Sequence, residues 1–158
     1  MARSPSKRTR LERFAALGQR RQGLLIEASA WLLCARAVLL FVPFPKIAPR
    51  LGAFMAPTDA RARTVGACAD PGDAELARQV GWAIARAAAH VPFEAVCLPQ
   101  AMAARVMLQR RGVASVLHLG AAKGRDKPLD AHAWLDAAGV EVTGFPVARA
   151  FTEIACFV

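Results

Sequence analysis

Cysteine and histidine are the residue types in this sequence that could perform nucleophilic chemistry. Cys97 is followed by the largely apolar run LPQAMAARVMLQ, which two arginines and a glycine close. That pattern predicts a helix that opens at Pro92, carries Cys97 in its first turns and stops at Gly112. The unpaired N–H groups and the dipole at a helix N-terminus favour the thiolate, which is the nucleophilic form of cysteine. Cys97 is therefore the candidate nucleophile, and a small buried thiol is the alternative interpretation.

A cysteine nucleophile needs a base that takes its proton. The chain has three histidines, which are His90, His118 and His132. His90 lies at the expected end of a helix, where an imidazolium would favour the dipole. In the run DAHAW, strand alternation places Asp130, His132 and Trp134 on one face, so this imidazole has a polar neighbour and an aromatic wall. These residues fit a catalytic dyad of Cys97 and His132. They also fit a buried thiol and an unrelated structural histidine on a strand.

The elements that must position these residues are helical in the first part of the chain. The apolar run over residues 23–45 predicts a long helix that Pro43 and Pro45 stop, because the residue before a proline avoids helical geometry. A second long helix is expected over residues 70–90, where the apolar positions follow helical spacing. Two short helices are expected over residues 50–55 and 59–65.

After Gly112 the pattern becomes typical of strands. Residues 113–122 form a β-rich run, residues 129–144 read as a hairpin that turns at Ala138 and Gly139, and residues 150–158 end the chain as another strand. Helices followed by antiparallel strands predict an α+β domain with one central helix packed on a sheet.

The apolar run over residues 23–45 also raises the question of a membrane span. A spanning helix needs about 20 apolar residues with few charges, whereas Glu27 and Arg36 interrupt this run. The following VPFPKIAP does not resemble the small-residue cleavage site of a signal peptide. We therefore expect a core helix, with peripheral membrane contact left open.

Charge and length suggest one folded domain behind a basic arm. The chain has 158 residues and a net charge of +9, and residues 1–21 hold seven basic residues against one acid. We expect an arm over residues 1–21 and a single domain over residues 22–158. Such an arm suits an anionic membrane or an acidic partner as well as nucleic acid, and nucleic acid is not the expected partner.

The cysteine spacing favours reduced thiols in the cytoplasm. The four cysteines are Cys34, Cys68, Cys97 and Cys156. They form no C-x-x-C pair and no histidine cluster accompanies them, so neither a disulfide framework nor a metal site is expected. No cofactor is expected either.

Three motifs in order resemble a known family. The helix CLPQAMAARVMLQRRG, the strand VASVLHLGA and the segment LDAHAWLDAAGVEVTG resemble the transglutaminase-like leader peptidase of lasso peptide biosynthesis. The upstream EASAWLLCARAVLLFVPFPKIAPRLG is similar to the N-terminal segment of that family. The resemblance covers roughly residues 24–157 and is strongest at Cys97 and His132.

The resemblance implies cysteine-protease chemistry on a transglutaminase-like, papain-like fold. Cys97 would attack the scissile carbonyl of a precursor peptide, and His132 would pass the thiol proton to the leaving amine. Trp134, the aromatic neighbour of the histidine, is the candidate for substrate contact. The implied partners are the precursor peptide, a leader-recognition protein that resembles the pyrroloquinoline-quinone biosynthesis chaperone, and an ATP-dependent macrolactam cyclase similar to asparagine synthetases.

The sequence departs from the family pattern in two places. The acid expected about a dozen positions after the histidine is missing, because that region reads VTGFP. Glu141 on the next strand and Asp130 on the histidine's own strand are the candidate orienters, and an amide, a backbone carbonyl or water could serve instead. The arm over residues 1–21 is also too short for the leader-recognition domain that some members carry. We therefore expect a stand-alone peptidase that needs a separate leader-recognition protein in trans.

Two other functions fit the same residues. The fold could transfer the acyl group to an amine instead of water, as transglutaminases do. A non-enzymatic reading makes the chain a basic adaptor that binds a membrane or nucleic acid through residues 1–44. Loss of function on Cys97→Ala would separate both enzymes from the adaptor.

Overall fold

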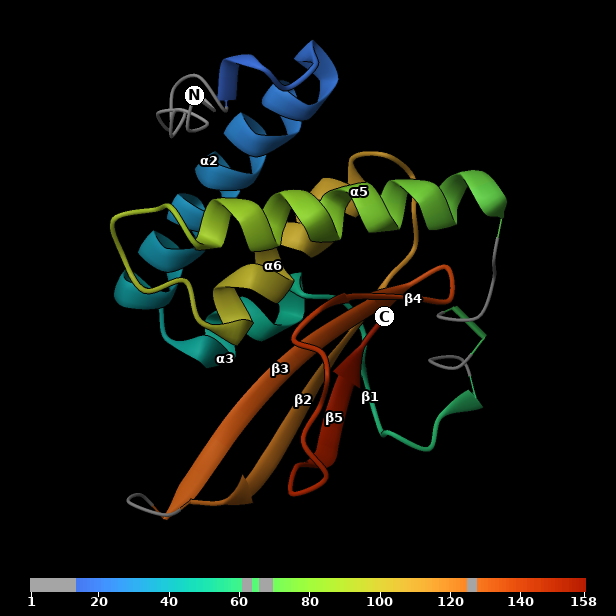
Figure 1. Ribbon diagram of the computed structural model, residues 1–158. Coiled ribbons are helices and arrows are strands. Elements are labelled where there is room, and N and C mark those ends of the chain that lie inside the picture. Colours follow the sequence, from blue (N-terminus) through green and yellow to red (C-terminus); the bar gives the residue numbers. More distant parts are fainter. Residues whose placement is uncertain (1–13, 61–63, 66–69, 125–127) are drawn as a thin grey trace, which may run out of the picture.

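Helices and a five-stranded sheet make up the computed structural model, which describes residues 14–60, 64–65, 70–124 and 128–158 (Figure 1). The helical elements are α2 (Gln19–Phe41), α3 (Phe44–Ile47), the 3-10 turn η1 (Ala48–Arg50), α5 (Pro71–Ala88) and α6 (Cys97–Gln109). The strands are β1 (Phe54–Met55), β2 (Val116–Lys123), β3 (Leu129–Ala137), β4 (Val140–Thr143) and β5 (Thr152–Phe157). The α+β class predicted from the sequence is confirmed.

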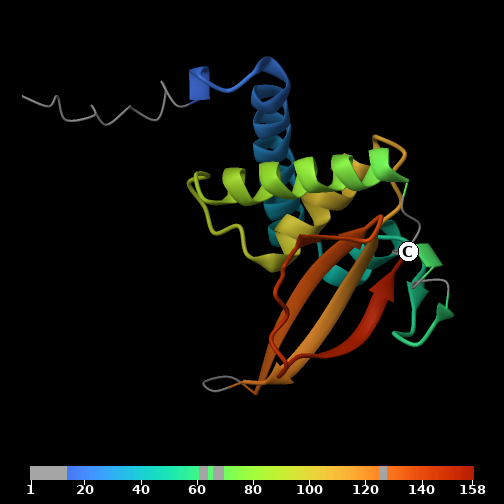
Figure 2. The ribbon, with the colours of Figure 1, turned by 45° about the vertical axis from the view of Figure 1, so that its right-hand side comes forward.

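All pairings in the sheet are antiparallel, and the strand order is β1-β5-β2-β3-β4. In the β2–β3 hairpin, Leu117 lies opposite Leu135 and His118 lies opposite Trp134. Figures 1 and 2 show α2, α5 and α6 gathered over one end of the sheet, while the β2–β3 hairpin extends away from them. Because neighbours in a strand face opposite sides, one face of this hairpin carries leucines and the other carries histidines.

Helix α6 is the central helix that the sequence predicts. Eight of its 13 residues are buried, and it contacts α2, α5 and β3. Ala101, Ala104 and Met107 are fully buried in the same core as Leu117 and Leu135. The leucine face of the hairpin therefore packs on the helix side of the molecule.

The helix that carries the cysteine begins later than expected. Val96 is its extended N-cap and Cys97 is its first residue, so Pro92 lies outside the helix. A helix from Pro92 would place Pro99 in its interior, where proline removes a hydrogen bond and clashes with the preceding turn. Starting at Cys97 puts Pro99 in the first turn, where no N–H is needed.

The short helix expected over residues 50–55 is also wrong in part. The 3-10 turn ends at Arg50, Gly52 adopts a φ of 122°, and Phe54–Met55 forms β1. A φ in that range ends a helix, and the exposed edge of β5 then supplies backbone partners for β1. Of the other short helix, over residues 59–65, residues 61–63 lie outside the described part of the chain.

Helix α2 accounts for the apolar run near the N-terminus. It starts at Gln19, so Arg20 and Arg21 of the expected arm belong to the helix, and it ends at Phe41, just before the two prolines. Among the described residues it is the one helix long and apolar enough to cross a membrane. Glu27, which interrupts the run, forms an ion pair with Arg111 at the end of α6.

Candidate active site

Cys97 occupies the N-terminal end of α6, as predicted. The residue is half-buried and packs against the main core, which includes Ala133 of β3. The side-chain amide of Gln100 donates a hydrogen bond of 2.6 Å from Nε2 to the carbonyl oxygen of Ala95. This bond holds the segment that leads into the helix. As the first helical residue, Cys97 has a backbone N–H that needs no intrahelical partner, so this N–H can bind a developing oxyanion.

His132 lies on β3, and a backbone carbonyl fixes its tautomer. Its Nε2 is 2.7 Å from the carbonyl oxygen of Gly144. A carbonyl oxygen only accepts hydrogen bonds, so Nε2 must carry the hydrogen. In the neutral ring Nδ1 is then left with a free lone pair, and this is the atom that can take a proton from a thiol. Trp134 and Phe151 flank the ring, with centroid distances of 5.9 and 5.1 Å.

Gly144 is the residue that the sequence analysis did not identify. Its φ is 81°, and an added Cβ would lie 2.4 Å from the carbonyl oxygen of Ala133 and 2.8 Å from Cα of Trp134. Only glycine fits this position, and its conformation aims the carbonyl at His132. The position falls in VTGFP, the segment where the family's acid is missing. A main-chain acceptor therefore stands where a carboxylate was sought.

The two candidate carboxylates make no described contact with the histidine. Glu141 lies opposite Asp136 in the β3–β4 register and is exposed, and Asp130 is exposed near the outer end of β3. In the described part of the chain, no hydrogen bond or ion pair joins either residue to His132. Their proposed orienting role stays a prediction.

Trp134 is buried between His118 and His132 on the same face of the sheet. Its residue exposure is 8%, and its ring lies over Gly120, where an added Cβ would be 2.7 Å from Cζ3. Its described ring contacts are with His118 on one side and His132 on the other. Substrate contact by Trp134 stays a prediction, while its packing role is visible.

His118 is bound by a carboxylate at each ring nitrogen. Nδ1 lies 2.6 Å from Oε1 of Glu153, and Nε2 hydrogen-bonds to Oδ1 of Asp136. Burial alone would lower the pKa of His118, but the hydrogen bonds and charges of Asp136 and Glu153 outweigh burial and raise the pKa. Carboxylates accept hydrogen bonds, so these two contacts favour the imidazolium form, in which both ring nitrogens carry protons. In that form His118 has no lone pair with which to act as a base.

Cys97 and His132 come from adjoining elements, since α6 contacts β3. Ala133 faces the helix side, so alternation turns His132 toward the other face of β3. Strand β4 pairs with β3 at residues 135–137, and His132 lies beyond this pairing. No hydrogen bond between Cys97 and His132 is formed among the described residues. Their direct contact, and with it the dyad, stays a prediction.

The other cysteines lie in different surroundings. Cys156 is fully buried, and its Sγ lies 3.6 Å from the carbonyl oxygen of Met55. Burial raises the pKa of the Cys156 thiol, with a smaller contribution from the charge of Glu153. Cys34 is exposed on α2, and Cys68 falls outside the described residues. Cys97 is thus the described cysteine at a helix N-terminus.

Arg105 was also missed by the sequence analysis. It is 4% exposed and donates to the carbonyl oxygens of Ser115 and Phe157, both at 2.9 Å. Burial lowers its pKa to about 10. The guanidinium ties the middle of α6 to the end of β5 and thereby holds the cysteine helix on the sheet.

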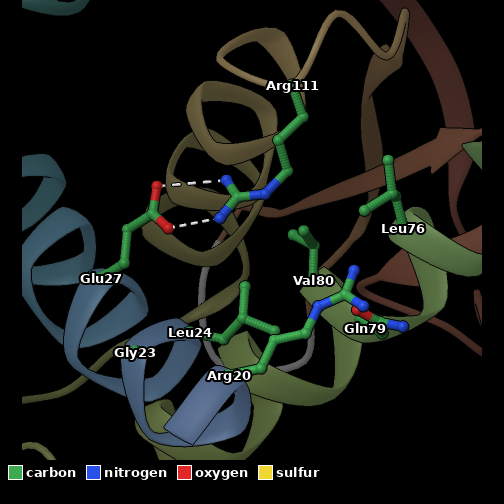
Figure 3. Close-up of a pocket in the computed structure, with 8 residues that line it drawn as sticks. All are labelled: Arg20, Gly23, Leu24, Glu27, Leu76, Gln79, Val80 and Arg111. Carbon is green, nitrogen blue, oxygen red and sulfur yellow. Dashed lines mark hydrogen bonds and ion pairs between the residues drawn. The ribbon is translucent and has the colours of Figure 1, made fainter.

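A pocket lies at the opposite end of α6 (Figure 3). It has a volume of about 320 Å³ between α2, α5 and Arg111, and Arg111 grips Glu27 with contacts of 2.6 and 3.2 Å. The hydrogen bond from Arg111 lowers the pKa of Glu27, against the effect of burial. A helix of 13 residues is about 20 Å long, so this pocket is separate from Cys97. Within the described residues, no cluster of three or more histidine, cysteine or acidic side chains could hold a metal.

Comparison with known proteins identifies the class. The sequence profile of the transglutaminase-like superfamily matches residues 38–156. The chain therefore belongs to the transglutaminase-like superfamily, which includes cysteine proteases and acyltransferases and whose members are usually cysteine-dependent enzymes. Neither a curated protein nor a solved structure gave a match. The predicted transglutaminase-like fold, with helices followed by a small antiparallel sheet, is confirmed.

Proposed function

We propose that this chain is a cysteine peptidase that removes the leader from a ribosomally made lasso precursor peptide. The observation that supports it best is the hydrogen bond from Nε2 of His132 to Gly144, because it leaves Nδ1 as the base. Cys97 begins the helix that packs beside the same strand. The lasso assignment itself is supported by the CLPQAMAARVMLQRRG and DAHAW motifs in their order.

The proposed reaction has two steps. In the first, Nδ1 of His132 takes the proton of Cys97, and Sγ attacks the scissile carbonyl to form a C–S bond. The C–N bond then breaks as the imidazolium returns the proton to the leaving amine. In the second step, water attacks the thioester while His132 takes its proton, and the C–S bond breaks to release the leader as a carboxylate and restore the thiol. The backbone N–H of Cys97 stabilises the oxyanion in both steps.

The proposed cellular setting follows from the same assignment. The leader peptide would be presented by a recognition protein in trans, which resembles the pyrroloquinoline-quinone biosynthesis chaperone. The amine released by cleavage would be the nucleophile for a macrolactam cyclase similar to asparagine synthetases. All of this would take place in the cytoplasm.

Mass spectrometry of a reconstituted reaction tests the proposal. The purified chain is incubated with a lasso precursor peptide and its recognition protein, with and without a labelled primary amine. Free leader carboxylate supports a peptidase, and a leader that carries the amine would show an acyltransferase. Cys97→Ala should abolish either product, whereas the exposed Cys34→Ala should leave it unchanged. Cleavage that survives Cys97→Ala would contradict the proposed mechanism.

A further inference from the structure

We propose that the outer face of α2, formed by Ile26, Ala30, Leu33, Leu40 and Phe41, binds the surface of an anionic membrane. The proposal goes beyond peptide cleavage and does not depend on it. It would make the domain a peripheral membrane protein whose catalytic residues work beside the bilayer.

The outer face of α2 is apolar and unpacked. Ile26, Leu33 and Leu40 recur every seven residues and form one row along the helix, with exposed fractions of 63%, 58% and 62%. Phe41 at the end of the row is 83% exposed. A run of large apolar side chains this exposed is unusual on a soluble domain and marks an interaction site.

The opposite face of α2 is the one that holds the fold together. Its buried residues are Leu24, Ala28, Leu32 and Ala35, and they pack in the main core with α5 and α6. The helix is therefore apolar on both sides, and the domain uses only one. Packing within the described residues does not explain the second side.

Among the described residues, no unpaired acidic side chain interrupts the outer face. Between Gln22 and Phe41 the helix carries two charged residues, Glu27 and Arg36. Glu27 is held by Arg111, and Arg36 is half-buried. A face without acidic side chains can approach a negatively charged surface without repulsion.

Exposed cations follow the outer face at its C-terminal end, where Lys46 and Arg50 come after α2. Arg20 and Arg21, at the start of α2, lie toward α5 instead. The sequence before the helix adds five more basic residues against one acid, Glu12. Cations beside an apolar helix face suit anionic lipid, since long basic side chains reach the phosphates while the apolar residues enter the acyl region.

The packing of α2 favours a helix that lies on the membrane over one that crosses it. A span would require lipid around the whole helix, which would strip Leu24 and Leu32 from the core and break the pair between Glu27 and Arg111. The helix is about 35 Å long, and Figures 1 and 2 show its N-terminal half projecting beyond the other helices. Its outer face can therefore meet a surface while the fold stays intact.

Vesicle sedimentation with the full chain tests the proposal. We expect sedimentation with vesicles that mix phosphatidylglycerol and phosphatidylcholine, weaker sedimentation with phosphatidylcholine alone, and release by high salt. Leu33→Glu should reduce the bound fraction at least about tenfold, because its carboxylate would have to leave water. Ile154→Glu is the matched control, since Ile154 on β5 is also 58% exposed and the charge change is identical. It should bind like the unchanged chain.

Three results would overturn the proposal. These are no sedimentation with the anionic vesicles, equal sedimentation of Leu33→Glu and the unchanged chain, or a concentration-dependent dimer that Leu33→Glu dissolves, which would assign the face to a second copy. Thermal unfolding of both variants checks that they fold. Leader cleavage in solution by Leu33→Glu should be unchanged, so failure of membrane binding and failure of the peptidase proposal remain distinguishable.

Discussion

Two histidines lie on one face of the sheet, on either side of Trp134, and their partners make them chemically different. His118 stacks on the indole at 5.4 Å with an angle of 4° between the rings, and carboxylates hold both of its nitrogens. His132 has one carbonyl partner and keeps a lone pair. Position on a strand does not decide which histidine can act as a base. The number and type of hydrogen-bond acceptors around the imidazole ring decide it.

The largest expected effect is on catalysis by His132. His132→Ala should reduce leader cleavage at least about a thousandfold, because residues that act as one catalytic unit fail together. Single-turnover cleavage followed by mass spectrometry measures it. His118→Ala should keep measurable activity. If His118→Ala abolished cleavage while His132→Ala remained active, His118 and not His132 would be the base.

Gly144 tests whether the carbonyl really sets the base. Gly144→Ala should lower stability by about 2–4 kcal/mol and reduce cleavage strongly, because its Cβ would meet the carbonyl oxygen of Ala133. Gly139→Ala is the control, since Gly139 has a similar φ of 72° and nothing within 4 Å. It should cost about 1 kcal/mol and little activity. Urea unfolding and cleavage rates of the pair separate strain from loss of the acceptor, and equal effects would count against the role of Gly144.

His118 should contribute to stability in a pH-dependent way. Its raised pKa means that the folded chain holds this proton more tightly than the unfolded chain, whose value is about 6.5. The contribution is fully present below that value and is lost as pH rises through the folded pKa. His118→Gln should therefore cost about 1–3 kcal/mol in weakly acidic solution and less in alkaline solution. Urea unfolding of both chains across this pH range measures the difference in their free energies of unfolding. A difference that grows as pH rises would contradict the stabilising role of the contacts of His118 with Asp136 and Glu153.

The smallest effects are expected from the two exposed carboxylates. Glu141→Gln and Asp130→Asn should each change cleavage by less than about threefold and stability by less than about 0.5 kcal/mol, because neither side chain contacts His132 in the described residues. Steady-state kinetics of both variants measures this. A large fall in turnover with unchanged stability would identify that carboxylate as the orienter.

The fold was predictable where local signals decide it. Gly112 and the two arginines before it ended α6 as expected, and Ala138 and Gly139 turned the hairpin. The strand at Phe54–Met55 was missed because its partner is β5, about a hundred residues away. A two-residue strand has no pattern of its own, so only the tertiary pairing defines it.

The positions of the candidate side chains on their helix and strand were predictable, whereas the backbone contact of His132 was not. Cys97 at a helix start and His132 beside Trp134 follow from residue types and spacing. The carbonyl of Gly144 could not, because any residue has one, and only the folded conformation says where it points. The contacts of His118 with Asp136 and Glu153 likewise depend on the register that joins three strands.

The central claim is that His132 activates Cys97, and the alkylation rate of Cys97 tests it most directly. The full chain and the His132→Ala variant are treated with iodoacetamide over a range of pH, and each cysteine is followed by peptide mass spectrometry. The account predicts that Cys97 is labelled first and that His132→Ala slows its labelling at least about tenfold near neutral pH. First labelling of another cysteine, or a rate at Cys97 that His132→Ala leaves unchanged, would contradict the account.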